Sequence, residues 1–500
     1  MYFNCRDVVG GCKVFAEAKD AGCDCITYNA TITGFVRENM HEEALSVLTE
    51  MMAAGVSPDE LTFVTIMSAC DCAKVGRKLQ AKAMKSGFEA YTSVSNATIT
   101  MYSSVGELRA AELIFERLEE RDLISWNVMI SSYTEGSFER SAFLTFLQMQ
   151  GAGIASDKFT VGSLLMITEF LETVAMIHAF VFKNGLLMQT EVSNALISSY
   201  SKHERVDIAH QVFCEMLYQN LISWNAVISG FLFNGNPLVS LALFSELLAA
   251  KLSSDVCTIT HIVNSCACIS ALNYGRQVHN FIIRFGFMSE TCLGNALISL
   301  YAKCGNLDWS IRVFNVMIHK DVVSWNSLIS AFAQHGEGKE AVMCFKAMQD
   351  PINVIRPDSA TFTALLSACS HAGLVEDALK ILDAMVTSYG VIPETDHLSC
   401  IVDLLGRAGF LDEAEKVGSV QAHPNIWWAL FSACVAHGDL RLGRIVAEYL
   451  LEADKNDSSV YIQVSNIYAG AGQWDEATNI REFMRNNGVS KQLGWSSVSI

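Results

Sequence analysis

The sequence is poor in proline, with 6 among 500 residues, and only 18% of its residues are charged. Scarce proline, together with many unbranched or aromatic apolar residues such as 27 Phe and 19 Met, favours a mostly helical chain. No apolar run is long enough to cross a bilayer, so we predict no transmembrane span and no membrane partner. Because 51% of the residues are hydrophobic, the chain can bury a large core, which argues against disorder.

The motifs of several enzyme classes are missing. A zinc deaminase needs His-x-Glu followed by Pro-Cys-x-x-Cys, and no Cys-x-x-Cys occurs in this sequence. His-x-Glu occurs at His41/Glu43 and His335/Glu337, where we interpret it as incidental. We find neither a phosphate-binding loop nor a nucleophile elbow. We therefore predict that the chain is not an enzyme and has no cofactor, no catalytic residue and no metal site.

Cysteine is abundant, but its spacing suits neither disulfides nor zinc. The N-terminal residues lack an apolar signal region, so we interpret most of the 16 Cys as reduced core residues. Structural zinc sites usually leave two to four residues between neighbouring cysteines, and the local pairs here leave one. These pairs are Cys23/Cys25, Cys70/Cys72 and Cys266/Cys268.

Positive charge is also in short supply. The net charge is −18, from 53 Asp and Glu against 35 Lys and Arg. This balance argues against a nucleic-acid partner, because neutralising phosphates requires Lys and Arg. Any interpretation that involves RNA has to meet this objection.

What the sequence does contain is repetition. Ser-Trp-Asn occurs at 125–127, 223–225 and 324–326, and a related string ends at residue 29. The asparagines that close these four strings are 98, 98 and 101 residues apart. A second set, in phrases such as "VSNALISSY" and "LGNALISLY", precedes the Ser-Trp-Asn asparagines by 31 residues each. A fixed period of this kind indicates a repeat architecture. The two sets are Asn29, Asn127, Asn225 and Asn326, and Asn96, Asn194 and Asn295.

Each unit has the pattern of two short helices. Over 123–157, apolar residues at i, i+3, i+4 and i+7 form one helical stripe, Gly136 interrupts it, and a second stripe follows. A single hairpin of this size cannot bury both faces, so we predict an all-α solenoid of stacked hairpins with a continuous core. The two stripes are Trp126, Met129, Ile130 and Tyr133, and Ala142, Phe146 and Met149.

These repeats resemble the plant pentatricopeptide repeat family, specifically its P-L-S subgroup. The resemblance rests on "SWN", "NALISLYAKCG" and the order and spacing of three unit types, and it covers essentially the whole chain. It implies a right-handed α-solenoid superhelix of stacked helix-turn-helix repeats. The expected P units are 25–59, 123–157, 221–255 and 322–358, the L units 60–91, 158–189, 256–290 and 359–394, and the S units 92–122, 190–220, 291–321 and 395–425.

The resemblance also implies a domain order. We expect a partial S-type repeat at 1–24, the P-L-S array at 25–425, an E region of helical hairpins at 426–492 and the start of a post-E tail at 493–500. The first two L units are three residues short. Because the sequence starts inside a unit, we expect that upstream repeats and a targeting peptide are missing from it. It stops where longer members of the family continue into a DYW deaminase domain.

The repeated asparagines are the candidate functional residues. Neighbouring helical residues point about 100° apart, so with Trp126 in the core Asn127 lies beside the packing stripe. Stacking then aligns the seven asparagines along one face, where an amide can read the Watson–Crick edge of a base. The alternative is that each Asn caps its helix. Seven asparagines in register, none replaced by Ser, Thr or Asp, favour a function.

In the pentatricopeptide repeat family, the fifth and last residues of a unit jointly select one RNA base. The resemblance implies U for Asn with Asp, C or U for Asn with Asn, and A for Ser with Asn. The L units carry Val64, Gly162, Thr260 and Thr363 at the fifth place, where the code is unreliable. The implied target, 5′ to 3′, is U, any, U, U, any, pyrimidine, U, any, U, U, any, A. The candidate pairs are Asn29/Asp59, Asn96/Asp122, Asn127/Asp157, Asn194/Asn220, Asn225/Asp255, Asn295/Asp321, Asn326/Asp358 and Ser399/Asn425.

Four tryptophans mark the C-terminal part of the chain: Trp427, Trp428, Trp474 and Trp495. We expect Trp427 and Trp474 in the hairpin core, whereas an exposed aromatic here would belong to a partner-docking surface. The resemblance implies that E-region proteins without their own deaminase recruit one in trans. It also implies that the final S unit lies over the base four positions before the edited C.

The chain is therefore interpreted as a sequence-specific single-stranded RNA-binding protein, the site-recognition factor for C-to-U editing of organellar transcripts. Its expected partners are organellar RNA, a trans-acting DYW-type deaminase and editing accessory proteins that bind through the E region. One-base-per-unit recognition depends on edge hydrogen bonds and stacking, which weakens the charge objection. We expect a mitochondrial location, with the chloroplast as the alternative. Organellar splicing or transcript stability, and a tetratricopeptide-like protein scaffold, remain open as other functions.

Overall fold

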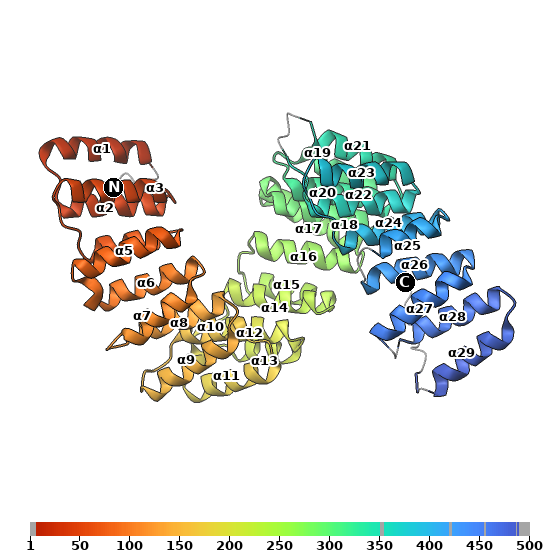
Figure 1. The fold of residues 1–500 in the computed structure, drawn as a ribbon, viewed down its shortest axis with the longest axis horizontal. Coiled ribbons are helices and arrows are strands. Elements are labelled where there is room, and N and C mark those ends of the chain that lie inside the picture. Colours follow the sequence, from red (N-terminus) through yellow and green to blue (C-terminus); the bar gives the residue numbers. More distant parts are fainter. Residues whose placement is uncertain (1–6, 351–354, 420–422, 455–456, 487, 490–500) are drawn as a thin grey trace. The chain divides into compact units, whose positions relative to one another are not determined.

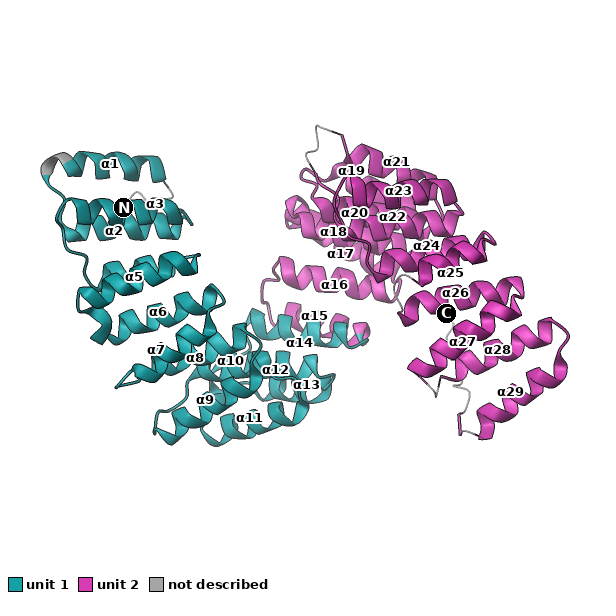
Figure 2. Ribbon diagram, viewed as in Figure 1, with its two compact units in different colours: residues 1–236 teal, residues 237–500 magenta. Residues whose placement is uncertain are grey.

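The computed structural model describes residues 7–350, 355–419, 423–454, 457–486 and 488–489. It divides into two compact units, residues 1–236 and 237–500 (Figures 1 and 2). All regular elements in the described ranges are helices, which confirms the predicted all-α class. No helix among these residues is long and apolar enough to span a membrane.

Among its described residues, the first unit contains α1 to α14 and two short 3-10 turns. Its elements are α1 (Val8–Ala21), α2 (Cys25–Arg37), α3 (His41–Ala53), α4 (Glu60–Ser68), α5 (Ala73–Lys85), η2 (Phe88–Ala90), α6 (Thr92–Ser104), α7 (Leu108–Arg117), α8 (Leu123–Glu135), α9 (Glu139–Gly151), α10 (Lys158–Ile167), α11 (Leu171–Lys183), η3 (Leu186–Met188), α12 (Thr190–Lys202), α13 (Val206–Glu215) and α14 (Leu221–Phe233).

In the part of the second unit that the structure describes, the elements are α15 to α29 and one 3-10 turn. Its elements are α15 (Pro237–Ala249), α16 (Val256–Cys268), α17 (Leu272–Arg284), η4 (Phe287–Ser289), α18 (Thr291–Lys303), α19 (Leu307–Val316), α20 (Val322–Gln334), α21 (Gly338–Met348), α22 (Ser359–Ala372), α23 (Val375–Thr387), α24 (Thr395–Arg407), α25 (Leu411–Gly418), α26 (Pro424–His437), α27 (Leu440–Ala453), α28 (Ser458–Gly470) and α29 (Trp474–Asn486).

Within each unit the even-numbered helices form a continuous layer, which we call the even layer. From α2 to α14 in the first unit, and from α16 to α28 in the second, each even helix packs on the next even helix (Figure 1). The odd helices α3 to α13 and α17 to α29 each pack against the even helix that precedes them. This succession of stacked hairpins confirms the predicted α-solenoid.

The hairpin of α8 and α9 follows the predicted stripes. Trp126, Met129 and Ile130 are buried on α8, and Tyr133, one turn further, is half-buried. The chain turns through Gly136 and Ser137, and the second stripe, Ala142, Phe146 and Met149, is buried on α9. Burying one large apolar side chain stabilises the fold by about 1.5–3 kcal/mol, so the two stripes hold the hairpin in the stack.

The Trp of Ser-Trp-Asn explains why part of that string is repeated. Each of the three tryptophans is buried and meets edge-on a Phe ring from the helix before it. The ring centroids are 5.1, 4.7 and 4.9 Å apart. Such aromatic pairs contribute about 0.5–1.5 kcal/mol beyond their buried area. The pairs are Phe115/Trp126, Phe213/Trp224 and Phe314/Trp325.

The first three L units end differently from the other units. After the second helix a glycine with a φ of +79°, +69° or +77° leads into η2, η3 or η4. Glycine adopts this left-handed conformation without steric cost, whereas other residues rarely do. The last L unit, over 388–394, passes to α24 without a 3-10 turn. The three glycines are Gly87, Gly185 and Gly286.

The C-terminal tryptophans divide between core and surface. Trp427 is buried on α26 and stacks on Tyr449 of α27 with ring centroids 4.8 Å apart. Trp474 is 67% exposed, so its predicted core position is wrong. It is the first residue of α29, whose buried residues are Ala477 and Met484. Trp495 and the expected tail at 493–500 lie outside the described residues.

Candidate functional site

The seven repeated asparagines occupy one equivalent place in the even layer. Each is the fifth residue of its helix, in α2, α6, α8, α12, α14, α18 and α20. The last residue of each P or S unit up to 358 directly precedes the next even helix and is its N-cap. The predicted partners of the asparagines therefore stand at helix N-termini.

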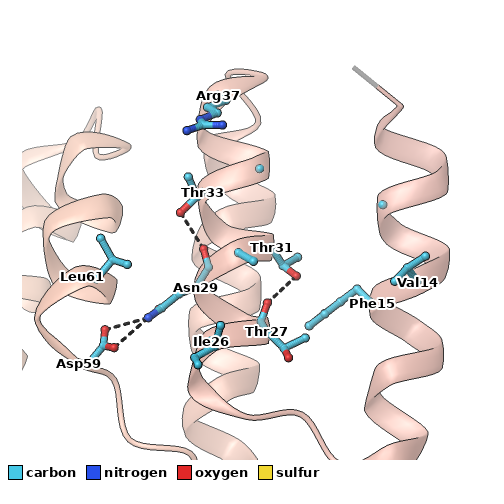
Figure 3. A pocket seen from close by; sticks show the side chains of 13 residues that line it. Val14, Phe15, Ile26, Thr27, Asn29, Thr31, Thr33, Arg37, Asp59 and Leu61 are labelled. Carbon is cyan, nitrogen blue, oxygen red and sulfur yellow. Dashed lines mark hydrogen bonds between the residues drawn. The ribbon is translucent and has the colours of Figure 1, made fainter. Parts of the chain in front are cut away.

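In three P units the Asn amide is held from both sides. Its nitrogen donates to the Asp carboxylate, at 2.9 Å in the first unit (Figure 3) and 3.0 Å in the second and fourth. Its oxygen accepts from a threonine hydroxyl at 2.5, 2.6 and 2.6 Å. A carboxylate accepts but cannot donate, so the amide nitrogen must face Asp and the oxygen must face Thr. The three groups are Asn29/Asp59/Thr62, Asn127/Asp157/Thr160 and Asn326/Asp358/Thr361.

In two S units the same pair is looser. The Asn–Asp distance is 3.5 Å from Asn96 to Asp122 and 3.3 Å from Asn295 to Asp321. A serine replaces the threonine, and its hydroxyl donates to the Asp at 2.7 or 2.8 Å without a described contact to the Asn. The amide oxygens of Asn96, Asn194 and Asn295 are buried and have no partner among the described residues. The S hairpin is also shorter, with an Asn–Asp separation of 26 residues against 30 or 32 in the P units.

One further predicted pair, Asn194/Asn220, is not joined by a described bond. Asn194 and Asn220 share no hydrogen bond in the described part of the chain, and the Asn220 oxygen instead accepts from the backbone of Ser223 at 2.9 Å. Asn225 is the fifth residue of α14 in the first compact unit, and Asp255 is the N-cap of α16 in the second. Asp255 caps α16 there by accepting from a backbone N–H at 2.8 Å.

The last predicted pair departs from the pattern. Ser399 is the fifth residue of α24, but Asn425 is the second residue of α26, whose N-cap is His423. The Asn425 backbone N–H lies 3.3 Å from the His423 ring nitrogen. No hydrogen bond joins Ser399 and Asn425 within the described residues. Five of the predicted pairs are thus joined by a hydrogen bond: Asn29/Asp59, Asn96/Asp122, Asn127/Asp157, Asn295/Asp321 and Asn326/Asp358.

The acidic member of each pair is also a helix cap. Asp122 accepts from the Ser125 N–H at 2.8 Å and Asp157 from the Thr160 N–H at 3.0 Å. The residue that caps the following even helix is thus the Asp, whereas each Asn lies inside its own helix and does not cap it. Burial acts to raise the pKa of these two carboxyls, but hydrogen bonds from hydroxyl, backbone and Asn amide groups outweigh it, and each pKa lies below its ordinary value. The carboxylates are charged at neutral pH.

Four of these carboxylates use a single oxygen. The described hydrogen bonds of Asp122, Asp157, Asp321 and Asp358 all fall on Oδ1, so Oδ2 has no partner among the described residues. Three of them, at 122, 321 and 358, are exposed. A charged acceptor beside an amide can take a hydrogen bond from a ligand N–H.

Sequence reasoning missed a row of exposed apolar side chains. The second residue of the P helices and of two L helices is large, apolar and between 55% and 76% exposed. In the P helices it lies three residues before the Asn, and residues three apart share one helix face. An apolar residue outside the core stripe at this spacing was the signal that could have revealed it. The row is Ile26, Leu61, Ile124, Phe159, Ile222 and Val323.

Around the first pair these groups line a hollow (Figure 3). It has a volume of about 520 Å³, and Ile26, Asn29, Asp59 and Leu61 are among its lining residues. Pockets of roughly 300–1,000 Å³ are typical of small-ligand sites. Arg37, in the last turn of α2, also lines the hollow. A donor, an acceptor, apolar walls and a cation thus meet at one place.

Cations recur at the ends of even helices despite the acidic composition. Arg37, Lys202, Lys303 and Arg407 each lie in the last turn of their helix, where a cation also complements the helix dipole. At the start of α10 the Lys158 ammonium lies 5.5 Å from the centre of the neighbouring Phe159 ring. Two of these cations are paired with a carboxylate, Lys158 with Glu191 and Arg407 with Asp403, while Lys202 and Lys303 lie on the helices of Asn194 and Asn295.

The two His-x-Glu matches lie in turns and helix starts. His41 opens α3, and His335 directly follows α20, with its ring nitrogen 2.9 Å from the Ala331 carbonyl oxygen. In the part of the chain that the structure describes, no group of three or more His, Cys, Asp or Glu is arranged to hold a metal ion.

Solved structures with the same fold are pentatricopeptide repeat proteins. The protein PPR10 in complex with an 18-nucleotide psaJ RNA element matches with a TM-score of 0.67, 18% identity, and coverage of 96% of this chain and 73% of that one. PPR10 from maize in a second structure matches with a TM-score of 0.52 and 17% identity, over 97% of this chain and 82% of that one. At these identities the likeness concerns the fold.

Family comparisons identify the repeats and the C-terminal module. The "PPR repeat family" matches residues 23–71 and 320–371, and the "PPR repeat" matches 124–154, 191–221, 222–252, 295–322 and 360–389. The "E motif" matches 437–499, within and beyond the E region expected at 426–492.

Two relatives from Arabidopsis thaliana carry the family name. The pentatricopeptide repeat-containing protein At3g49740 is 49% identical over 99% of this chain, which spans 68% of that protein. The pentatricopeptide repeat-containing protein At3g57430, chloroplastic, is 32% identical over 95% of this chain, which spans 56% of that protein. With these repeats, this fold and this identity, the chain belongs to the pentatricopeptide repeat family.

Proposed function

We propose that the protein binds single-stranded RNA in a sequence-specific manner and marks sites of C-to-U editing in organellar transcripts. The observation that carries this proposal is the row of Asn–Asp pairs at one equivalent place in the even layer. Each joined pair offers an amide donor and a charged carboxylate beside an exposed apolar face. The description of PPR10 in complex with an RNA element supports RNA as the ligand.

The chemistry of the pairs explains a preference for uracil. Uracil has carbonyl oxygens and a ring N–H on its pairing edge, whereas cytosine has an amino group and a ring nitrogen acceptor. A carboxylate can accept the uracil N–H but repels the cytosine ring nitrogen, while the Asn amide donates to a uracil carbonyl. Asn220, which replaces Asp in one unit, can donate or accept and so admits either pyrimidine.

The exposed apolar row supplies a surface for stacking. A base between Ile124 and Phe159, or between Ile26 and Leu61, would cover side chains that otherwise face water. Stacking of a base on an aromatic side chain contributes about 1–3 kcal/mol and tolerates any base. Cations such as Lys202 and Lys303 in the last turns of even helices lie near enough to this layer to serve the phosphates.

The E motif supports a role in editing rather than in another RNA process. We propose that the E region recruits a DYW-type deaminase and editing accessory proteins in trans, so this chain itself acts as a binder and not as an enzyme. Trp474, exposed at the start of α29, is a candidate contact for such a partner. Relatives named chloroplastic support an organellar location, and the choice between mitochondrion and chloroplast stays a prediction.

A gel-shift panel tests the RNA-binding part. The chain should bind the twelve-base target U, any, U, U, any, pyrimidine, U, any, U, U, any, A more tightly than scrambled RNA of the same composition. Equal affinity for both would refute the proposal. A transcriptome of plants lacking the gene tests the editing part, because loss of C-to-U conversion at one site supports it and loss of a transcript or spliced product contradicts it.

A further inference from the structure

The P and S units hold their asparagines differently although the same residue types pair. Each threonine that bonds the Asn of a P unit belongs to the L unit that follows, where it is fully buried and its hydroxyl has one proton to donate. Thr160 lies 2.6 Å from the amide oxygen of Asn127 and 3.0 Å from the carboxylate of Asp157, so the amide is its nearer acceptor. After the first S unit, Ser125 of the following P unit lies 2.7 Å from Asp122 and makes no described contact to Asn96.

This difference decides whether each Asn amide can offer its oxygen as an acceptor to a bound base or only its nitrogen as a donor. To turn its oxygen toward a ligand, Asn127 would have to break bonds to both Thr160 and Asp157. Asn96 would have to break a single bond of 3.5 Å, which is weak by its length. Its amide oxygen is also buried without a partner, an unfavourable state that rotation toward a donor would relieve. The P amide is fixed as a donor, and the S amide is free to accept.

We propose that Thr62, Thr160 and Thr361 are positioning residues that set how strictly a P unit separates uracil from cytosine. This inference rests on the proposed RNA-binding function. A fixed donor suits the carbonyl oxygen of uracil and fails to meet the amino group of cytosine. An S-unit amide that can rotate accepts from that amino group, so S units tolerate both pyrimidines. The hydroxyl belongs to the repeat after the one whose base it controls.

The first S unit provides a matched control for the second P unit. Ser125 and Thr160 occupy the same third place of an even helix, and both donate a backbone N–H to the Asp that caps it. Removing either hydroxyl loses a similar local contact near a cap. Only Thr160 also holds an Asn amide, so only its removal should change base selection.

The experiment uses the full chain with the twelve-base target and two single-base variants, U to C at base four under Asn127 or at base three under Asn96. In the unmodified protein, C at base four should weaken binding by roughly tenfold or more, and C at base three by about threefold or less. Thr160→Val should bring the base-four ratio down to the base-three ratio. Thr160→Ser keeps the hydroxyl in the longer P hairpin and should leave the base-four ratio close to that of the unmodified protein. Ser125→Ala should leave the base-three ratio unchanged. An unchanged base-four ratio in Thr160→Val would overturn the inference.

A second readout needs no RNA and separates the two hypotheses. In protein labelled with ¹⁵N at asparagine, the side-chain amide of Asn127 should exchange with water more slowly than that of Asn96. The two signals are assigned from Asn127→Ala and Asn96→Ala. Thr160→Val should speed exchange at Asn127, and equal exchange before and after would contradict the positioning role. If RNA fails to bind while the exchange result holds, the proposed function fails and the structural role of Thr160 stands.

Discussion

The L units and the P units share a stack but differ at the site. Phe63 and Phe362 in L units are as fully buried as the core residues of the P helices. At the fifth place, however, L units carry Val64, Gly162, Thr260 or Thr363 in place of Asn. The helices after the first three L units have the N-cap residues Tyr91, Gln189 and Glu290, none of which accepts a side-chain cap bond. Core packing and base recognition therefore depend on different residues of the same type of hairpin.

The last L unit lies between these two types. Its fifth residue, Thr363, has its hydroxyl 3.1 Å from the Nε2 of His397, which is fully buried at the third place of α24. The Nδ1 of His397 lies 3.0 Å from the backbone N–H of Glu394 and accepts from it. At this place the P and L helices carry serine or threonine, and the other S helices carry Val94, Val192 and Leu293. The comparison predicts where substitutions act on stability and where they act on binding.

The largest effect is expected in the core, where the two unit types should behave alike. Phe63→Ala in an L unit and Trp126→Ala in a P unit should each destabilise the array by about 3–5 kcal/mol, because each leaves a cavity in a close-packed stack. Thermal and urea unfolding followed by circular dichroism measures the loss. A much milder loss for Phe63→Ala would show that L units depend less on their core than P units do.

The next effect should separate the two types. Asn127→Ala should weaken binding of the twelve-base RNA by about 1–3 kcal/mol, equivalent to roughly 5- to 150-fold. Thr260→Ala, at the same place of an L helix, should change affinity by less than about twofold. Titration by fluorescence anisotropy measures both, and unchanged melting of Asn127→Ala confirms that its fold is intact. Equal losses for the two variants would break the distinction.

A smaller effect is expected at the caps. Asp157→Ala should destabilise the protein by about 0.5–2 kcal/mol, because the N-terminus of α10 loses its side-chain acceptor. Gln189→Ala should have no measurable effect on stability, because Gln189 makes no side-chain cap bond to α12. The melting temperature reports the difference. A comparable loss for Gln189→Ala would mean that the residue before an even helix acts in some way other than capping.

The smallest effect concerns acid. The pKa of Asp122 and Asp321 lies below its ordinary value, since hydrogen bonds outweigh the burial that opposes them. Their stabilising contribution is therefore present above the unfolded pKa of about 3.9 and is lost as pH falls through the lower folded value. Hydrogen exchange should show the first turns of α8 and α20 losing protection in this range. The first turns of α6 and α12, which lack an acidic cap bond, should keep their protection.

Much of the fold followed from periodicity, because burial repeats with the helix period and proline is scarce. The stripes of 123–157 predicted α8 and α9, and the fifth-place asparagines fell on one layer. Sequence could not reveal that the Asp of each pair caps the next helix, since a cap needs a known helix start. It also could not reveal that Asn96 lacks a partner for its oxygen, because that depends on where Ser125 directs its proton. Trp474 was placed wrongly because size and hydrophobicity do not determine which face of a helix is covered.

One consequence concerns how such arrays change over evolutionary time. The bonds around Asn127 connect the fifth residue of one repeat to the cap and third residue that begin the next helix. A complete cassette therefore runs across a repeat border, roughly from 127 to 160. A duplication or deletion that breaks at the border would separate Asn127 and Asp157 from Thr160, whereas a break inside the following helix would move all three together. A segment that keeps Asn, Asp and Thr together, and with them the base selectivity, therefore starts and ends at other residues than the repeat that the sequence shows.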